Sequence, residues 1–192
     1  MVIDHVILAT ADLEAAAARL EAEHGLIAAG GGRHEGVGTH NRVIPLGGGY
    51  LEVMAVADPE EAAASPLGRI LAAAIARRAE RLLAWCVAVP DVDAVAARLG
   101  TDLHAIARQG LTARLTAVAE AMAEPLLPFF IERDPGVADP GASGQHGGIS
   151  WVEVAGDEGR LRDWLGGDEL PVRVVPGEPE LRAVGIGERE LR

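Results

Sequence analysis

Apolar runs followed by helical patterns recur along this 192-residue chain. The first run covers residues 2–10, and a helix is predicted to begin after Asp12, because an aspartate side chain accepts hydrogen bonds from the first helical amides. Asp91 stands 79 residues later in the same context, after the apolar run at 82–89. Both segments align without a gap over nine residues, from the aspartate to an Arg-Leu pair. The match indicates an internal duplication.

The segments after each predicted helix support the duplication. In the first half, apolar stretches at 26–28, 42–46 and 50–56 are separated by a glycine-rich loop at 30–38 and a triple-glycine turn. In the second half, similar stretches lie at 103–107, 112–118 and 126–132. Each half is therefore predicted to form a strand, a helix and then three strands.

A third, shortened copy is predicted near the end of the chain. It has a strand at 149–154, a helix at 157–165 and strands at 172–175 and 181–186, but no evident fourth strand. It either extends the sheet or pairs with another chain in a homodimer. We predict one domain over residues 1–192, with module one at 1–58, a connecting helix at 65–79, module two at 81–133 and the partial third module at 148–187.

Charge and composition narrow the classes of partner. The 29 acidic and 17 basic residues give a formal charge of −12, which disfavours binding to nucleic acid and to anionic membrane surfaces. The chain has no apolar stretch long enough to span a bilayer and no signal peptide pattern, so we expect a cytoplasmic protein. All 17 basic residues are arginine, which excludes lysine Schiff-base chemistry. Cys86, inside an apolar run, is interpreted as a buried and inert thiol.

The glycine-rich segment at 30–42 is the first candidate for binding. Its glycines let the backbone approach a ligand, so we expect a loop that faces the substrate. His34 and His40 are candidate proton carriers because imidazole titrates near neutral pH; the alternative is that both are solvated. The segment also supplies the candidate substrate-binding residues Thr39, Asn41 and Arg42, to which we add Tyr50 and His146.

Four segments together resemble the glyoxalase-like domain family of the vicinal oxygen chelate superfamily. They are Asp4-His5 in the first strand, the helix after Ala11-Asp12-Leu13, the segment at 31–42, and Tyr50-Leu51-Glu52. The resemblance implies an α+β fold in which tandem βαβββ modules curl into a half-open barrel. It also implies a divalent metal on the concave face, held by a histidine of the first strand and a glutamate of the fourth strand of each module. The implied activities on small molecules are those of a lyase or isomerase, or of a ring-cleaving dioxygenase.

The resemblance assigns His5 and Glu52 as metal ligands. The alternation of side chains along strands agrees with this assignment. In the first strand His5 shares a face with Ile3 and Ile7, and in the fourth strand Glu52 shares a face with Tyr50 and Met54. An imidazole and a carboxylate suit Zn, Fe, Mn, Co or Ni. Glu52, if released from the metal, is also the candidate catalytic base.

The second module matches this ligand pattern less well. The 79-residue offset maps His5 onto Ala84, and Glu52 onto Glu132 only if one residue is inserted. The third ligand is therefore expected to be Glu132, or a histidine from among His34, His40 and His146. The alternative function is a non-catalytic module that has lost the metal and sequesters a small molecule.

Overall fold

The structure, a computed structural model, describes residues 1–108 and 111–192, and Gln109 and Gly110 lie outside the described residues. In the first module β1 (Val2–Thr10) and α1 (Leu13–His24) are followed by β2 (Gly30–His34), β3 (Thr39–Pro45) and β4 (Tyr50–Val56). Two helices, α2 (Pro59–Ala64) and α3 (Pro66–Arg77), connect it to the second module. That module contains β5 (Glu80–Ala88), α4 (Val92–Leu99), β6 (Leu103–Arg108), β7 (Leu111–Thr116), α5 (Val118–Ala123) and β8 (Phe129–Arg133).

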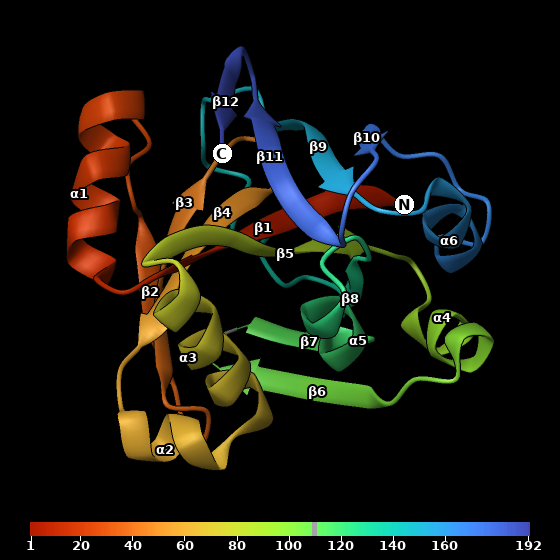
Figure 1. The fold of residues 1–192 in the computed structure, drawn as a ribbon, viewed down its shortest axis with the longest axis horizontal. Coiled ribbons are helices and arrows are strands. Elements are labelled where there is room, and N and C mark those ends of the chain that lie inside the picture. Colours follow the sequence, from red (N-terminus) through yellow and green to blue (C-terminus); the bar gives the residue numbers. More distant parts are fainter. Residues whose placement is uncertain (109–110) are drawn as a thin grey trace.

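The two modules form one curled eight-stranded sheet (Figure 1). Its strand order is β2-β3-β4-β1-β5-β8-β7-β6. The two modules thus occupy the two halves of the sheet, and equivalent strands lie at equal distances from the opposite edges. In each module the first strand pairs in parallel with the last, β1 with β4 and β5 with β8, while β1 and β5 join the modules in antiparallel orientation. The predicted α+β fold of tandem βαβββ modules is confirmed.

The helix signals of the two modules match closely. Asp12 accepts a hydrogen bond from the Ala15 amide, and Asp91 accepts one from the Ala94 amide. Both helices end at a glycine in the left-handed region, Gly25 with φ 67° and Gly100 with φ 68°. These positions require φ values that other residues adopt at a cost, so the repeat includes the helix stops as well as the starts.

The predicted substrate-facing loop at 30–42 is wrong in part, because its first residues form β2. Gly31 has φ 139°, and a Cβ there would lie 2.1 Å from the backbone oxygen of Asn41. Glycine is what allows β2 to pair this closely with β3, and pairing satisfies backbone groups that a loop would leave to water. The stretch at 26–28, predicted as a strand, has no regular structure. The helices α2 and α5 were not anticipated from the sequence.

The third segment forms a separate four-stranded sheet. It contains β9 (Ile149–Ala155), α6 (Glu158–Trp164), β10 (Val172–Val175), β11 (Glu180–Ile186) and β12 (Arg189–Leu191), in the order β10-β9-β11-β12. The prediction that this segment extends the first sheet is therefore wrong. Its first strand, β9, pairs with β10 and β11, whereas β1 and β5 each pair with the last strand of their own module. The strand pairing of the third segment therefore differs from that of the two modules. Pairing with another chain stays a prediction.

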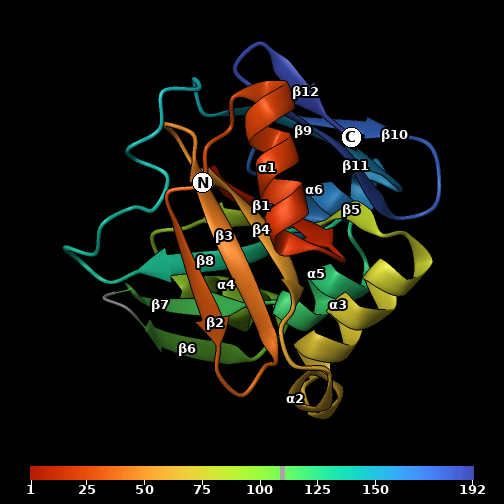
Figure 2. The ribbon, with the colours of Figure 1, turned by 90° about the vertical axis from the view of Figure 1, so that its left-hand side faces the viewer.

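The two faces of the large sheet carry different elements. Figures 1 and 2 show α1 and the smaller sheet on one side of β1 and β5, with α3 and α5 on the other. The first side holds the larger core, where Trp85 and Phe130 are fully buried and the Trp164 indole donates to the Pro128 carbonyl at 2.8 Å. The second, concave side is left partly open. None of the described helices is both long enough and apolar enough to cross a membrane.

Candidate functional site

A β-bulge in β1 sets the orientation of the first candidate residue. Ile3 pairs with Val87 and His5 pairs with Cys86, so Asp4 is the extra residue between them. The bulge places Ile3 in the core beside the smaller sheet and leaves His5 lining the concave cavity with Ile7. The prediction that Ile3 and His5 share a face is therefore wrong, because a bulge interrupts the alternation and re-aims the side chains after it.

The His5 ring is held on several sides. Its Nδ1 lies 2.6 Å from Oδ1 of Asp4, and the ring stacks on Tyr50 with a centroid distance of 4.5 Å. Phe129 packs edge-on against it at 5.3 Å. An ionised carboxylate only accepts hydrogen bonds, so Asp4 assigns the proton to Nδ1 and leaves Nε2 as the acceptor or ligand atom. This Nε2 lies 3.8 Å from Oε2 of Glu52.

Asp4 is in turn held by an arginine of the second module. Arg133 is the last residue of β8, and both of its terminal nitrogens donate hydrogen bonds to the Asp4 carboxylate, one of them at 2.7 Å. Burial alone would raise the pKa of Asp4, but the hydrogen bonds from Arg133 and His5 outweigh it and lower that pKa well below its usual range. Asp4 therefore remains ionised, and Arg133 fixes His5 through it.

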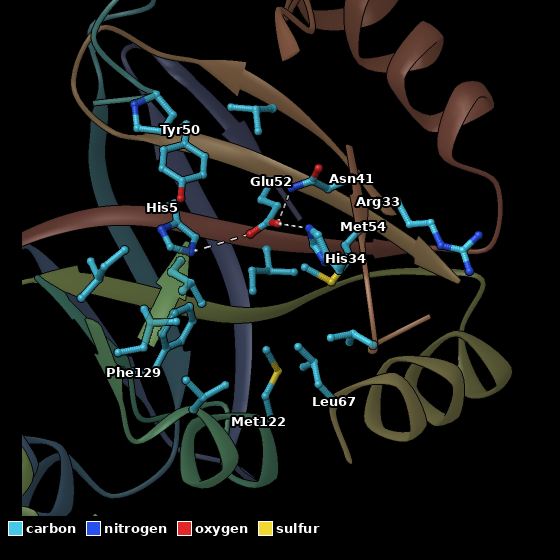
Figure 3. A pocket seen from close by; sticks show the side chains of 18 of the residues that line it. His5, Arg33, His34, Asn41, Tyr50, Glu52, Met54, Leu67, Met122 and Phe129 are labelled. Atoms are coloured by element: carbon cyan, nitrogen blue, oxygen red, sulfur yellow. Dashed lines mark hydrogen bonds and ion pairs between the residues drawn. The ribbon is translucent and has the colours of Figure 1, made fainter. Parts of the chain in front are cut away.

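Glu52 is the centre of the polar part of the site (Figure 3). It is 7% exposed, and its Oε1 accepts a hydrogen bond from the Asn41 amide at 2.6 Å. Asn41 is itself oriented by the Gly32 backbone amide, which donates to its Oδ1 at 2.9 Å. On the side away from His5, Nε2 of His34 lies 3.8 Å from Oε1 of Glu52. Thus two imidazoles flank one carboxylate.

Thr39 and Tyr50 complete this polar group. The Thr39 hydroxyl lies 2.8 Å from Nδ1 of His34, so it orients that ring from behind. Burial, together with the nearby charge of Glu52, raises the pKa of Tyr50 well above its usual range. Its phenol therefore stays protonated at neutral pH and is available as a donor.

A cavity of about 430 Å³ on the concave face of the large sheet is lined by His5, His34, Asn41, Tyr50 and Glu52. Its polar lining comes from the first module, and most of the remaining lining is apolar. The lining residues are His5, Ile7, Arg33, His34, Glu35, Val37, Asn41, Val43, Tyr50, Glu52, Met54, Leu67, Ile106, Leu115, Val118, Met122, Phe129, Ile131 and Pro140. A largely apolar cavity with a few convergent polar groups is typical of a small-molecule site.

Five candidate residues lie outside this lining. Thr39 reaches it only through His34, Glu132 lies on the opposite face of β8, and the other three lie away from Glu52. His40 and Arg42 alternate along β3 with Asn41 and so point to the other face, where Arg42 donates to Glu14 at 2.6 Å. His146 is half-buried in the connection before β9, where its backbone amide donates to the Leu46 carbonyl. The structure therefore does not bring these three side chains to Glu52.

Glu132, the expected third ligand, is also separated from His5 and Glu52. Its neighbour Ile131 lines the cavity, and alternation turns Glu132 to the opposite face of β8. There its carboxylate accepts hydrogen bonds from the Val92 amide at 2.8 Å and from Arg114 at 2.9 Å. Glu132 thus stabilises the start of α4, and the one-residue insertion that mapped it onto Glu52 is not present.

The strand registers identify the true counterparts in the second module. Ile7 pairs with Glu52, and Cys86, its counterpart, pairs with Phe129. Phe129 therefore occupies the position that Glu52 has in the first module, and Ala84 occupies that of His5. Within the part of the chain that the structure describes, the polar group around Glu52 is built by the first module.

Other clusters of potential ligands are less suited to a metal. Among the described residues, the groups of three or more whose ligand atoms lie within 4.8 Å of one another are Asp4-His5-Cys86 and Asp91-Asp93-Glu132. In the first, burial raises the pKa of the Cys86 thiol well above its usual range, and Asp4 is already engaged by Arg133. In the second, Arg114 donates to both Asp93 and Glu132. The inert thiol predicted for Cys86 agrees with this burial.

The donor set around Glu52 fits a divalent metal better. Each of His5 and His34 directs Nδ1 to an oxygen and Nε2 toward the carboxylate, which is the arrangement of metal-binding histidines with outer partners. Two imidazoles and a carboxylate suit the first-row transition metals. His34 is thus the third donor of this group, for which the described residues of the second module offer no counterpart.

Sequence reasoning missed Asp4 and Arg133 as parts of the site. A signal for the first was present, because an ionisable residue within the apolar run of residues 2–10 needs a charged partner if it is buried. The partner itself lies 129 residues further along the chain, and only the pairing of β1, β5 and β8 brings the two together.

Comparison with known proteins was made at three levels. A family model described as a glyoxalase-like domain matches residues 3–165. No curated protein matches the chain. Among solved structures, a hypothetical protein from Staphylococcus aureus superposes with a TM-score of 0.69 at 15% identity, covering 93% of this chain and 87% of that one.

Several methylmalonyl-CoA epimerase structures also match. The enzyme from Mycobacterium tuberculosis has a TM-score of 0.51 at 19% identity and covers 70% of this chain and 87% of that one. A Streptomyces coelicolor variant in complex with 2-nitronate-propionyl-CoA has a TM-score of 0.51 at 18% identity, covering 69% and 96%. At these identities the likeness concerns the fold.

Proposed function

Because the chain belongs to the glyoxalase-like domain family, we propose that it is a divalent-metal-dependent enzyme of the isomerase or lyase type, acting on a small molecule in the concave cavity. The observation that carries the proposal is the placement of Glu52 between two imidazoles, with Nε2 of His5 and Nε2 of His34 each 3.8 Å from one of its oxygens. Because Asp4 accepts the hydrogen bond from Nδ1 of His5, Nε2 of His5 presents a lone pair to the Glu52 carboxylate, and a cation between these two groups would bind both.

We propose His5, His34 and Glu52 as the residues that hold the ion. When bound, a divalent ion polarises a carbonyl oxygen and stabilises the negative charge that develops on it. Asp4 keeps the His5 ring in one tautomer, and Asn41 holds one oxygen of Glu52 at 2.6 Å. The Tyr50 phenol, which remains protonated, is positioned beside His5 to donate to a substrate oxygen. The surrounding apolar side chains exclude water and so strengthen each of these interactions.

The test of the metal proposal uses two matched histidine variants. Protein purified without chelator is expected to contain about one transition-metal ion per chain by elemental analysis. His34→Gln should weaken binding of Co²⁺, titrated by its visible absorption, by about 10-fold or more. His40→Gln, on the other face of the same hairpin, should bind Co²⁺ like the unaltered protein. Metal content at background, or equal titrations for the two variants, would overturn the proposal.

A second candidate function is a metal-free module that sequesters a small molecule. It is favoured by the apolar residues Ala84 and Phe129 at the ligand positions of the second module. In this case the neutral fluorophore N-phenyl-1-naphthylamine should bind equally well before and after treatment with EDTA, and purified protein should carry no metal. Dioxygenase chemistry, a further possibility within the family, predicts that the iron-loaded protein consumes oxygen only when a catechol is added, because the cleaved ring takes up both oxygen atoms.

Two other expectations also stay proposals. We propose a cytoplasmic location, testable by cell fractionation. We also propose a homodimer, for which sedimentation velocity at several concentrations should show the mass of two chains.

A further inference from the structure

The cavity is chemically divided between the two modules (Figure 3). The side chains around Glu52 that form hydrogen bonds come from β1 to β4. Every described lining residue from α3, α5 and β6 to β8 is apolar, and these residues are Leu67, Ile106, Leu115, Val118, Met122, Phe129 and Ile131. A ligand that fills the cavity therefore meets polar groups at one end and hydrocarbon at the other.

We infer that the occupant is a small amphipathic molecule, with an oxygen-bearing polar group at one end and an uncharged alkyl or aromatic body that lies against α3 and the second module. This inference rests on the proposed function for the polar end. A polar body on the apolar side would lose its water without gaining a partner, which is costly. An apolar body gains free energy in proportion to the area that it buries there.

The charges near Arg33, which also lines the cavity, argue against an anionic body. Arg33 donates to Asp58 and, at 2.6 Å, to Glu61, and it lies 4.0 Å from Glu35. Three carboxylates therefore surround one guanidinium, and the local charge is negative. This disfavours a phosphate-bearing tail and leaves Arg33 engaged within the protein.

The size and shape of the wall indicate how large the body is. A cavity of about 430 Å³ is at the lower end of the range for small-molecule sites. Met54 and Met122 face each other across it, below Glu52 in Figure 3, and methionine side chains adapt to ligands of irregular outline. A short alkyl chain or a single ring is the body that fits.

The test compares two hydroxamates on Zn²⁺-loaded protein by calorimetry. Acetohydroxamic acid and hexanohydroxamic acid have the same chelating oxygens, and the second has four more methylenes. At about 0.8 kcal/mol for each buried methylene, or roughly fourfold in affinity, the longer compound should bind about 200-fold more tightly. Equal dissociation constants for the two compounds would overturn the inference.

Two glutamine variants of α3 locate the body within the cavity. Leu67 is half-buried in the wall of the cavity. Leu67→Gln should reduce the ratio of the affinities for hexanohydroxamic and acetohydroxamic acid at least about threefold, as expected for the loss of one or two methylene contacts. Ala73→Gln, at an exposed position of the same helix, should leave it unchanged. Equal effects of the two variants would contradict the assignment of this wall.

Hexanamide and acetamide separate this inference from the proposed function. Neither has a chelating pair of oxygens, so the apolar wall should favour hexanamide with or without metal. If hexanamide binds more tightly and no metal binds, the metal proposal fails and the apolar site stands. If metal binds but chain length has no effect in either series, the apolar site fails and the metal proposal stands.

Discussion

Arg133 at the end of β8 donates two hydrogen bonds to Asp4 in the bulge of β1, across 129 residues of sequence. The arginine belongs to the second module and the aspartate to the first. Through Asp4 the second module orients His5, although none of its described residues contributes a polar side chain to the cavity. The ion pair therefore links the packing of the two modules to the geometry of the site.

Removal of Arg133 should destabilise the fold. Arg133→Met leaves a buried carboxylate without its partner, and we expect the free energy of unfolding to fall by about 3 kcal/mol. Urea denaturation measures this loss. The exposed pair of Arg162 and Glu158, 3.4 Å apart, provides the control, because Arg162→Met should cost less than about 0.5 kcal/mol. Similar losses for both variants would show that the Arg133 pair behaves like a surface ion pair.

The contribution of Asp4 to the free energy of unfolding should depend on pH in a defined direction. Its pKa is lowered in the folded protein, so on acidification the unfolded chain takes up the proton first and is stabilised. The stabilisation by Asp4 is therefore complete above its ordinary pKa of 3.8 and is lost as the pH falls toward the folded-state value. In urea denaturation from pH 6 to pH 2.5, roughly the range in which Asp4 titrates in the unfolded chain but stays ionised in the folded protein, the difference in free energy of unfolding between the unaltered protein and Asp4→Asn should narrow. A gap that does not change with pH would contradict this assignment.

The β2–β3 hairpin should tolerate a methyl group at Gly30 but not at Gly31. A Cβ at Gly31 would lie 2.1 Å from the Asn41 carbonyl oxygen, whereas nothing lies within 4 Å of a Cβ at Gly30. We expect Gly31→Ala to lower the free energy of unfolding by about 2 kcal/mol or more, and Gly30→Ala to change it by less than about 0.5 kcal/mol. Thermal and urea denaturation of both variants check this. Equal effects would mean that β2 is not held against β3 at this point.

Asn41 should act on metal binding through Glu52. Asn41→Ala removes the hydrogen bond that holds Oε1 of Glu52, so affinity for Co²⁺ should fall about 10-fold to 100-fold, the usual range for an outer partner of a ligand. His40→Ala, at the adjacent position on the other face of β3, is the control and should have no effect. Asn41→Asp should also weaken binding, because a carboxylate cannot donate to Glu52. An Asn41→Ala variant with unaltered affinity would assign Asn41 to substrate binding alone.

Local signals in the sequence were sufficient to predict the α+β modules. The cap residues Asp12 and Asp91 act on amides three residues away, and the apolar runs at 2–10 and 82–89 form strands whatever their partners are. The family resemblance proposed His5 and Glu52 for the site, and it could do so because the segments that carry it are short and do not depend on long-range packing.

The exact composition of the site was decided by tertiary structure. The bulge at Asp4 reversed the face of Ile3, and strand register placed Phe129, and not Glu132, opposite Cys86. Neither effect has a local signal, because a shift of one residue in register moves every side chain to the other face. Thus the chain by itself determined its modules and the first two polar residues of the site. Pairing between distant strands decided that His34 joins them and that an arginine 129 residues from Asp4 orients His5.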